Sequence, residues 1–421
     1  MQAISKVNGL PVNDNGILTQ EAAAKNDAFG RLRVSNPVTL FDSKQIFDNA
    51  PLFFDDSEVS GTGTTSTYTK AKAMTQMAVS ENTEGKHVRQ SFMRMNYLPG
   101  KSQLSFLTFK MNGSVSGVKS CVGLFDDDNG LFFTDDEGTL KMVTRTSSSG
   151  SAVDVPIEQD DWNVDTLDGT GASRITLDVS KTQILIIDFE WLGVGRVRMG
   201  FVIDGTVYYV HEFMNANNLT EVYMSTPNLP VRYSIENDGT GAVSTLDHIC
   251  SSVMSEGGAE DNGALRRKST GGTATVMTSE NLAYAIIGVR LKSTHLQATV
   301  KLIDAAIQLQ TASEQIEWFL SFNPTVAGTF TYSDVTNSAI QTAIGASANT
   351  VTSGFEISGG FIESGGNQAG NAGSGDKGIL NALLLGSKID GTPDEIVLCG
   401  RPVGGSSGVA AEGALVWREL S

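Results

Sequence analysis

Residues 88–249 consist of short runs in which apolar and polar side chains alternate. The runs are rich in β-branched and aromatic residues, and they cover residues 103–111, 118–125, 131–133, 139–145, 173–179, 184–191, 196–203 and 206–213. Alternation with a period of two is typical of a β-strand with one buried and one solvated face. The pattern therefore predicts β-strands along this whole part of the chain.

Turn-forming residues separate these runs. Asp204-Gly205 lies directly between two of them, and Asn129-Gly130, Glu137-Gly138 and Asp168-Gly169 occupy similar positions. Such residues tolerate the positive φ that tight hairpins require. Evenly spaced strands joined by hairpin turns predict an antiparallel sandwich or barrel rather than a βαβ fold.

Changes in composition divide the chain. Residues 1–60 have little periodic apolar sequence and are predicted to be an extended N-terminal arm; a Gly/Thr/Ser stretch follows at 61–67. The polar stretch in 251–280 is predicted to be a linker, and strand-like runs resume after it. The predicted fold is all-β: an antiparallel β-sandwich of jelly-roll type over 61–250 and a second, C-terminal β-sandwich over 281–421.

Charge and cysteine content exclude several classes of protein. The 421 residues include 30 Lys+Arg against 47 Asp+Glu, a formal charge of −17. The longest basic cluster is residues 266–268, so we expect binding neither to nucleic acid nor to a membrane. Three scattered cysteines predict no disulfide framework and no zinc site. The N-terminus lacks the apolar core of a signal peptide, and no apolar run reaches the ~18 residues of a membrane span, so we expect a soluble product of the cytoplasm.

Two features with catalytic associations are interpreted as structural. Residues 373–378 match GxGxxG, but a Gly/Asn tract rather than a strand precedes them, which indicates a loop rather than a dinucleotide site. His87, His211, His248 and His295 are isolated in the sequence. They predict neither a metal centre nor a catalytic pair.

Asp126, Asp128 and Asp135 belong to an acidic stretch around residues 131–133. Carboxylate oxygens are hard ligands that suit Ca²⁺, although the alternating DxDxDG spacing of a calcium loop is absent. Two interpretations stay open: a calcium site on these three residues, or solvated hairpins that use Asp in their turns. Apart from this Ca²⁺, no cofactor is predicted.

Asp188 and Glu190 are the sharpest candidates for chemistry. As residues i and i+2 of a strand they share a face and lie about 6.6–7 Å apart, within the range that separates the carboxyl groups of glycosidases. Two acids facing a core would be costly, so we expect this face to be solvated or to line a groove. The pair is therefore a candidate acid/base pair or a candidate ligand for sugar hydroxyls.

The segment Arg198 to Glu212, RMGFVIDGTVYYVHE, resembles the returning strand pair of the concanavalin A-like sandwich of legume lectins and laminarinase-like glucanases. The resemblance implies a curved sheet whose concave face binds sugar. Enzymes of that fold carry Glu, then Asp two residues on, then a further Glu. Asp188 and Glu190 match the last two, but Ile186 stands where the nucleophile should be, which speaks against hydrolysis.

A second resemblance covers residues 28–250. The motifs at residues 27–44, 162–171, 189–198 and 223–233 are similar to a family of virion structural proteins of tailed bacteriophages. The resemblance implies a particle component of the capsid, collar, tail or fibre, with other virion proteins and further copies of the chain as partners. Phe29, Arg31 and Arg33 would dock the arm on an acidic neighbour; the alternative is an ordinary strand whose arginines face water.

Together these observations predict a non-enzymatic structural protein of a virion, assembled as a homo-oligomer and binding host-surface polysaccharide through Asp188, Glu190 and Trp191. An aromatic ring such as that of Trp191 can stack on a sugar, or it can anchor the core between two sheets. The alternative function is a polysaccharide-active glycoside hydrolase that uses Asp188 and Glu190. A third interpretation is a secreted cellular lectin.

Overall fold

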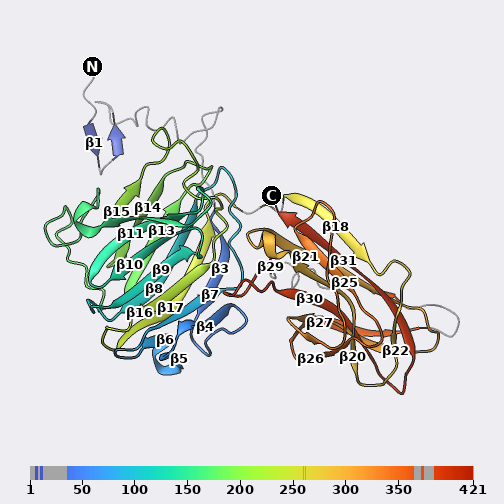
Figure 1. The fold of residues 1–421 in the computed structure, drawn as a ribbon. Helices are drawn as coiled ribbons and strands as arrows, with labels where there is room; N and C mark the ends of the chain where they lie inside the picture. The colour runs from blue at the N-terminus through green and yellow to red at the C-terminus, as the bar shows by residue number, and fades with distance from the viewer. Residues whose placement is uncertain are drawn as a thin grey trace.

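The computed structural model describes residues 36–258, 260, 262–364 and 384–420, and the backbone alone at 5–7, 10–12 and 371–373. Two β domains lie beside each other, the N-terminal one coloured blue to yellow-green and the C-terminal one yellow to red (Figure 1). At the N-terminal end, β1 (Ser5–Val7) pairs antiparallel with β2 (Leu10–Val12). The helical segments of the described residues are the 3₁₀ turns η2 (Lys70–Lys72), η3 (Gln159–Asp161) and η4 (Ser293–His295). No helix in these residues is long and apolar enough to span a bilayer.

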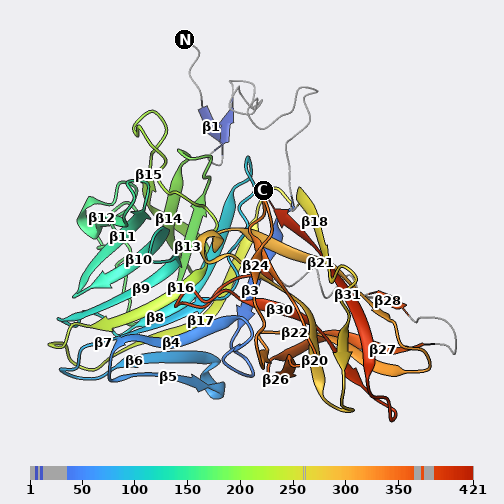
Figure 2. The same ribbon diagram turned by 45° about the vertical axis from the view of Figure 1, so that its right-hand side comes forward.

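The first domain is a sandwich of two antiparallel sheets (Figure 2). Sheet I has the order β12-β11-β10-β9-β16-β7-β4, and sheet II has the order β15-β14-β13-β8-β17-β6-β5, with β3 also paired to β17. The strands of sheet I are β4 (Phe54–Gly61), β7 (Gly85–Ser91), β9 (Val118–Phe125), β10 (Gly130–Asp136), β11 (Thr139–Thr146), β12 (Val153–Glu158) and β16 (Val231–Asn237). Those of sheet II are β3 (Val38–Lys44), β5 (Thr64–Thr69), β6 (Met74–Val79), β8 (Gln103–Met111), β13 (Gln183–Phe189), β14 (Val197–Ile203), β15 (Thr206–Phe213) and β17 (Ser244–Ser255).

Alternate residues of facing strands fill the space between sheets I and II. Leu107 and Phe109 of β8, Leu185 and Ile187 of β13 and Phe133 of β10 belong to one fully buried cluster. Burying a side chain of this size stabilises the fold by about 1.5–3 kcal/mol. The period of two in these runs is thus the direct consequence of packing one face of each strand into the core.

The second domain repeats the two-sheet plan. Sheet III has the order β18-β31-β21-β28, with β19 on β31 and β29 on β21; sheet IV has the order β23-β26-β20-β30-β22-β27, with β25 on β20 and β24 on β25. The strands of sheet III are β18 (Gly263–Ser269), β19 (Thr275–Met277), β21 (Thr299–Leu309), β28 (Asn371–Gly373), β29 (Leu384–Leu385) and β31 (Val409–Leu420). Those of sheet IV are β20 (Ala283–Leu291), β22 (Gln315–Phe322), β23 (Thr325–Val326), β24 (Ser333–Asp334), β25 (Ile340–Ile344), β26 (Thr350–Thr352), β27 (Phe355–Glu363) and β30 (Glu395–Pro402).

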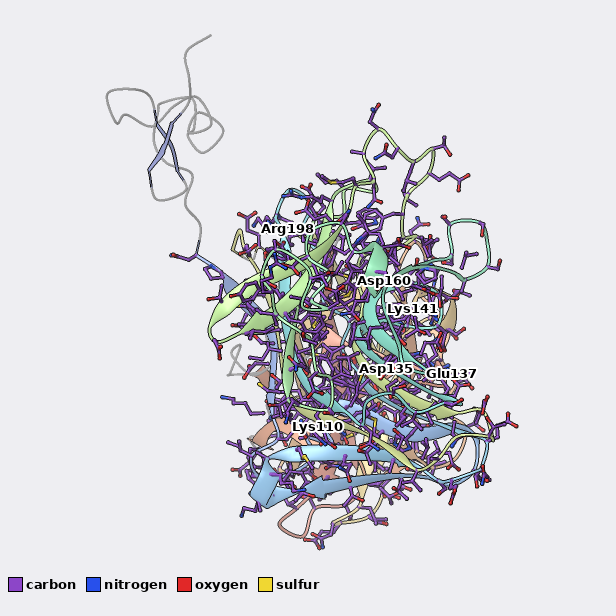
Figure 3. The ribbon with its side chains drawn as sticks, turned by 90° about the vertical axis from the view of Figure 1, so that its left-hand side faces the viewer. Lys110, Asp135, Glu137, Lys141, Asp160 and Arg198 are labelled. Atoms are coloured by element: carbon purple, nitrogen blue, oxygen red, sulfur yellow. The ribbon has the colours of Figure 1, made fainter. Side chains whose placement is uncertain are left out.

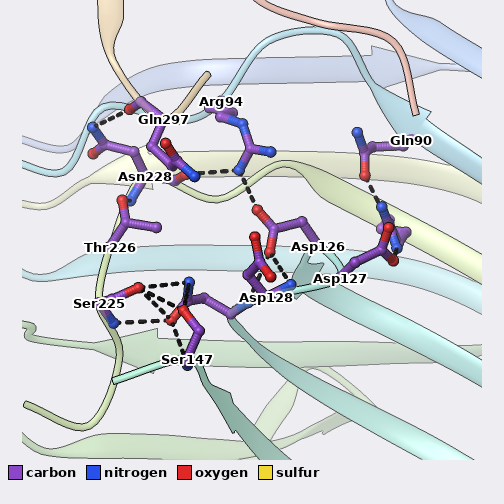
Figure 4. Close-up of polar contacts among 12 residues, drawn as sticks. Gln90, Arg94, Asp126, Asp127, Asp128, Ser147, Ser225, Thr226, Asn228 and Gln297 are labelled. Atoms are coloured by element: carbon purple, nitrogen blue, oxygen red, sulfur yellow. Dashed lines mark hydrogen bonds and ion pairs between the residues drawn. The ribbon is translucent and has the colours of Figure 1, made fainter. Parts of the chain in front are cut away.

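Hydrogen bonds join the two domains at two places. Asn228 Nδ2 of the first domain donates to the carbonyl of Gln297 at 3.1 Å (Figure 4). A hairpin at residues 386–394 of the second domain reaches sheet I, where the Ser387 amide donates to the Phe92 carbonyl at 3.2 Å. The first contact joins the first domain to the segment before β21, and the second holds the 386–394 hairpin against it.

The structure confirms the all-β class and its two antiparallel sandwiches, but several elements differ from those predicted. Residues 38–44 and 54–60 of the predicted arm belong to β3 and β4, and residues 263–269 of the predicted linker form β18. Each is a strand at or near a sheet edge with few buried side chains, so its sequence resembles that of a loop. Residues 173–179 form no regular strand, although Leu177 and Val179 are buried in the core.

Candidate functional site

The outer face of sheet II brings polar and aromatic side chains into two adjacent rows. Strand register aligns one row across β17, β8, β13, β14 and β15: Met254, Leu104, Asp188, Arg198 and Glu212. It aligns a second row on the same strands: Ser252, Phe106, Ile186, Gly200 and Tyr209. The intervening residues of these strands point into the core, so both rows lie on the face turned away from sheet I.

Asp188 is the centre of a polar cluster in these rows. Arg198 Nη2 donates to Asp188 Oδ2, and the Tyr209 hydroxyl donates to the same oxygen at 3.0 Å. The Arg198 guanidinium also lies 4.4 Å from the centroid of the Tyr209 ring, a cation–π contact. We refer to Asp188, Arg198, Tyr209 and the neighbouring Phe106 as the outer-face site.

Burial and charge determine which groups of the outer-face site can bind a ligand and whether Tyr209 is protonated. Asp188 is buried, whereas 32% of the Arg198 side chain is exposed, so the guanidinium has room for another acceptor. Burial, together with the Asp188 carboxylate, raises the pKa of Tyr209 well above its usual value. The phenol therefore stays protonated and remains a donor across the neutral range.

Glu190 does not join Asp188, because β13 ends at Phe189. Glu190 lies at the start of the hairpin turn that leads into β14, and its Oε1 accepts from the Arg196 amide at 3.3 Å. The two acids were predicted to share one face of the strand. In the structure they have separate structural roles. Asp188 holds Arg198 and Tyr209, and Glu190 caps the turn.

Trp191 packs at the rim of the core. Its ring meets Tyr97 edge-on with centroids 6.3 Å apart, and its indole Nε1 donates to the Met224 carbonyl at 3.0 Å. The Tyr97 hydroxyl in turn accepts from the Trp191 amide at 2.9 Å. These contacts favour the core-anchor interpretation of Trp191 over the sugar-stacking one.

Asp126, Asp128 and Asp135 are not brought together into one site. Asp126 lies before β10, where Oδ1 accepts from the Asp128 and Asn129 amides at 2.8 and 2.7 Å and Oδ2 pairs with Arg94 at 2.5 Å (Figure 4). Asp135 lies near the other end of β10 and accepts from the Gly138 amide. Within the described residues, no group of three or more His, Cys, Asp or Glu is placed to hold a metal ion. The described contacts of Asp126 and Asp135 thus fit turn capping and ion pairing.

Sheets I and II place the charged candidates on opposite sides of the sandwich. Figure 3 shows Arg198 on sheet II, across the sandwich from Asp135 and Lys141 on sheet I. Phe29, Arg31 and Arg33, predicted to dock the arm, lie outside the described residues, as does most of the GxGxxG segment at 373–378.

Arg198 and Tyr209 are functional candidates that the sequence analysis did not single out. Their segment was noted only for its fold resemblance. One signal was available: in a hairpin turning about Gly193, Asp188 stands opposite Arg198. Tyr209 was harder to place, because the pairing of β14 with β15 shifts register between Met199 and Gly200.

No protein-family model matches the chain, and no curated protein matches it. Among solved structures, it is similar to a Bacillus licheniformis β-glucanase, with a TM-score of 0.33 and 9% identity over 52% of this chain and 98% of that chain. A legume lectin-like domain from Entamoeba histolytica gives a TM-score of 0.31 and 9% identity over 51% and 97% of the two chains. Peanut lectin gives 0.29 and 10% over 52% and 98%. The assignment of the sandwich rests on the sheets and their register.

Proposed function

We propose that the protein is a non-catalytic, glycan-binding structural subunit of a tailed-phage particle. In this proposal the outer-face site binds a sugar of a host-surface polysaccharide, and other surfaces contact virion proteins and further copies of the chain. The virion assignment is supported by the motif resemblance in residues 28–250.

One observation carries the glycan-binding part: Asp188, Arg198 and Tyr209 form a pre-arranged set of donors and acceptors on the outer face of sheet II, with Phe106 in the adjacent row. Sugar sites combine aromatic surface, which stacks on the C–H face of a ring, with a few fixed polar groups that bind hydroxyls. Because Arg198 and Tyr209 are only half-buried, both can reach a ligand.

The arrangement supports binding rather than hydrolysis. Glycosidases need two carboxyl groups that flank the scissile bond, one of them free to give or take a proton. Here Asp188 is committed to Arg198, Glu190 is committed to the turn, and Ile186 occupies the next position on the same strand face. A polysaccharide hydrolase remains the alternative that the experiment must separate from a lectin-like protein.

The glycan proposal is tested by titrating the purified full chain with bacterial surface polysaccharides and analysing the products. We expect binding without cleavage, and we expect Tyr209→Ala to lose it. Tyr208→Ala is the matched control, because Tyr208 lies on the same strand opposite core-facing Phe201. Equal losses in both variants, or the release of shorter sugars, would contradict the proposal.

The virion proposal is tested on particles. We expect mass spectrometry of purified phage from a host that carries this gene to find the chain in fixed stoichiometry, and antibody labelling to place it on the particle. If the chain stays in the lysate and never co-purifies with particles, the virion assignment is wrong, whereas the glycan-binding proposal is unaffected.

A further inference from the structure

A cleft separate from the outer-face site lies where the hairpin 386–394 meets the outer face of sheet I. It has a volume of about 710 Å³, and residues of β4, β7 and β16 line it together with Lys388, Ile389 and Asp390 of the hairpin. The Ile389 amide donates to Asp55 Oδ2 at 2.9 Å and ties the hairpin to β4. Both domains therefore build the walls of this interdomain cleft.

Arg232 is the buried cation that lines the interdomain cleft, with only 4% of its side chain exposed. Strand register places it between Gln90 of β7 and Gly123 of β9. Its Nε donates to Gln90 Oε1 at 2.7 Å. The arginine is therefore held in one orientation by the sheet itself.

The acidic partner of Arg232 is far more accessible than the arginine. Arg232 Nη1 donates to Asp127 Oδ1 at 2.5 Å, yet 74% of the Asp127 side chain is exposed. Burial acts to raise the pKa of Asp127, but the Arg232 guanidinium outweighs it and holds that pKa below its usual value. Asp127 belongs to the turn before β10, so its carboxylate can leave without disturbing a strand.

The other carboxylates of the cleft have structural partners. Glu58 accepts from the Thr64 amide at 2.9 Å, and Asp390 accepts from the Thr392 amide at 2.8 Å. Lys86, which pairs with Glu236 at 3.2 Å, and the exposed Lys388 of the hairpin are further cations of the cleft. An incoming carboxylate would thus compete with Asp127 alone for Arg232.

We propose that the interdomain cleft binds the carboxylate of an acidic sugar, such as a uronate unit of a host-surface polysaccharide, on Arg232, and that Asp127 occupies this position in the free protein. An arginine fork matches a carboxylate in two parallel hydrogen bonds. Val59, which is exposed, and Ile389 supply apolar contact for the sugar ring. The proposal rests on the glycan-binding function above but assigns it a second site.

The overall charge narrows the ligand further. A chain of net charge −17 repels a dense polyanion at long range. The cleft therefore suits a uronate-containing polysaccharide, with at most one charge per sugar, better than a heavily sulfated or phosphorylated one.

The test is calorimetric titration of the full chain with an oligomannuronate, with neutral mannose oligomers as the control ligand. Loss of the charged fork in Arg232→Gln should weaken oligomannuronate binding at least about tenfold. Asp127→Asn removes the competing charge and should tighten binding by up to about fivefold. Because Asp127 is exposed, this variant keeps the test open even if Arg232→Gln fails to fold.

Unchanged or weaker oligomannuronate binding by Asp127→Asn would overturn the proposal, as would loss of that binding in Tyr209→Ala. The two sites fail separately. A wild-type chain that binds neutral surface polysaccharide but no oligomannuronate refutes the cleft and leaves the outer-face site standing. If the chain binds oligomannuronate through Arg232 and Tyr209→Ala changes the binding of no glycan, the outer-face site is refuted and the cleft is supported.

Discussion

Two of the arginine–aspartate clusters in the first domain differ chiefly in where they lie. Between the sheets, Arg89 is fully buried; its Nη1 donates to Asp56 at 2.6 Å and its Nε to His248 Nδ1 at 3.0 Å. On the outer face of sheet II, Arg198 pairs with Asp188 but remains partly exposed.

The exposure of the arginine indicates which of the two clusters a ligand can reach. The Arg89 cluster ties β4, β7 and β17 together, and removing Arg89 would leave the largely buried Asp56 with His87 and Ser66 but without its arginine. In the Arg198 cluster Asp188 is buried, but 32% of the Arg198 side chain is exposed, so a ligand can reach the guanidinium. Similar residue types thus form a structural clamp in one place and the proposed binding surface in the other.

The largest expected effect separates the two arginines directly. Arg89→Met should lower the free energy of unfolding by about 3–5 kcal/mol, because Asp56 then lacks its buried cation. Arg198→Met should lower it by less, because 32% of the Arg198 side chain is exposed to water and Tyr209 still donates to the buried Asp188. Urea unfolding of both variants measures this, and equal losses would break the distinction.

Trp191→Ala tests whether Trp191, at the rim of the core, stabilises the fold or binds a sugar. We expect the free energy of unfolding to fall by about 3 kcal/mol, because the variant loses buried ring area and leaves a cavity beside Tyr97. Glycan binding should persist. A variant with an unchanged melting temperature and no glycan binding would assign Trp191 to a sugar site instead.

Asp394 shows what a buried carboxylate does without an arginine partner. Burial raises its pKa to about 6, and its Oδ1 accepts from the neutral Asn323 amide group. Because the folded pKa exceeds the unfolded one, its stabilising effect is full below the unfolded pKa near 3.8 and is lost as pH rises through about 6. The second domain should thus lose up to about 3 kcal/mol between pH 4 and 7 from this group, and Asp394→Asn should remove that slope from urea midpoints.

His248 should give the first domain a pH dependence of the opposite sign. Burial, and then the charge of Arg89, lower the pKa of His248 well below its usual value. The unfolded state takes up a proton near pH 6.5 and the folded state does not, so stability falls as pH drops below that value, by at most about 1.4 kcal/mol per pH unit. His248→Gln should flatten the urea midpoint between pH 7.5 and 5.5.

The smallest expected effects concern the two candidate acids. Asp188→Asn and Glu190→Gln should each change the free energy of unfolding by about 1 kcal/mol or less, because one faces a partly exposed arginine and the other a turn amide. Neither variant should abolish any turnover of polysaccharide. Hydrolysis by the wild-type chain that is lost in either variant would replace the binding function with catalysis.

Much of the fold could be predicted from local pattern. Residues 103–111 and 118–125 form β8 and β9 with the predicted bounds, because alternation reports burial of one strand face. Asp188 was recognised as a candidate because an acid in an apolar strand is costly to bury. Strands β3 and β18 were missed, since edge strands bury few side chains and β18 carries three consecutive basic residues.

The sequence by itself determined the strands, the hairpins between neighbours and the absence of long helices in the described residues, because alternation and turn chemistry act over a few residues. Only the tertiary structure decided that Arg89 meets His248, 159 residues away, and that Arg232 meets Asp127, 105 residues away. The physical reason is that the pairing and register of strands distant in sequence follow from the packing of the whole core. A pattern of a few residues does not specify that packing.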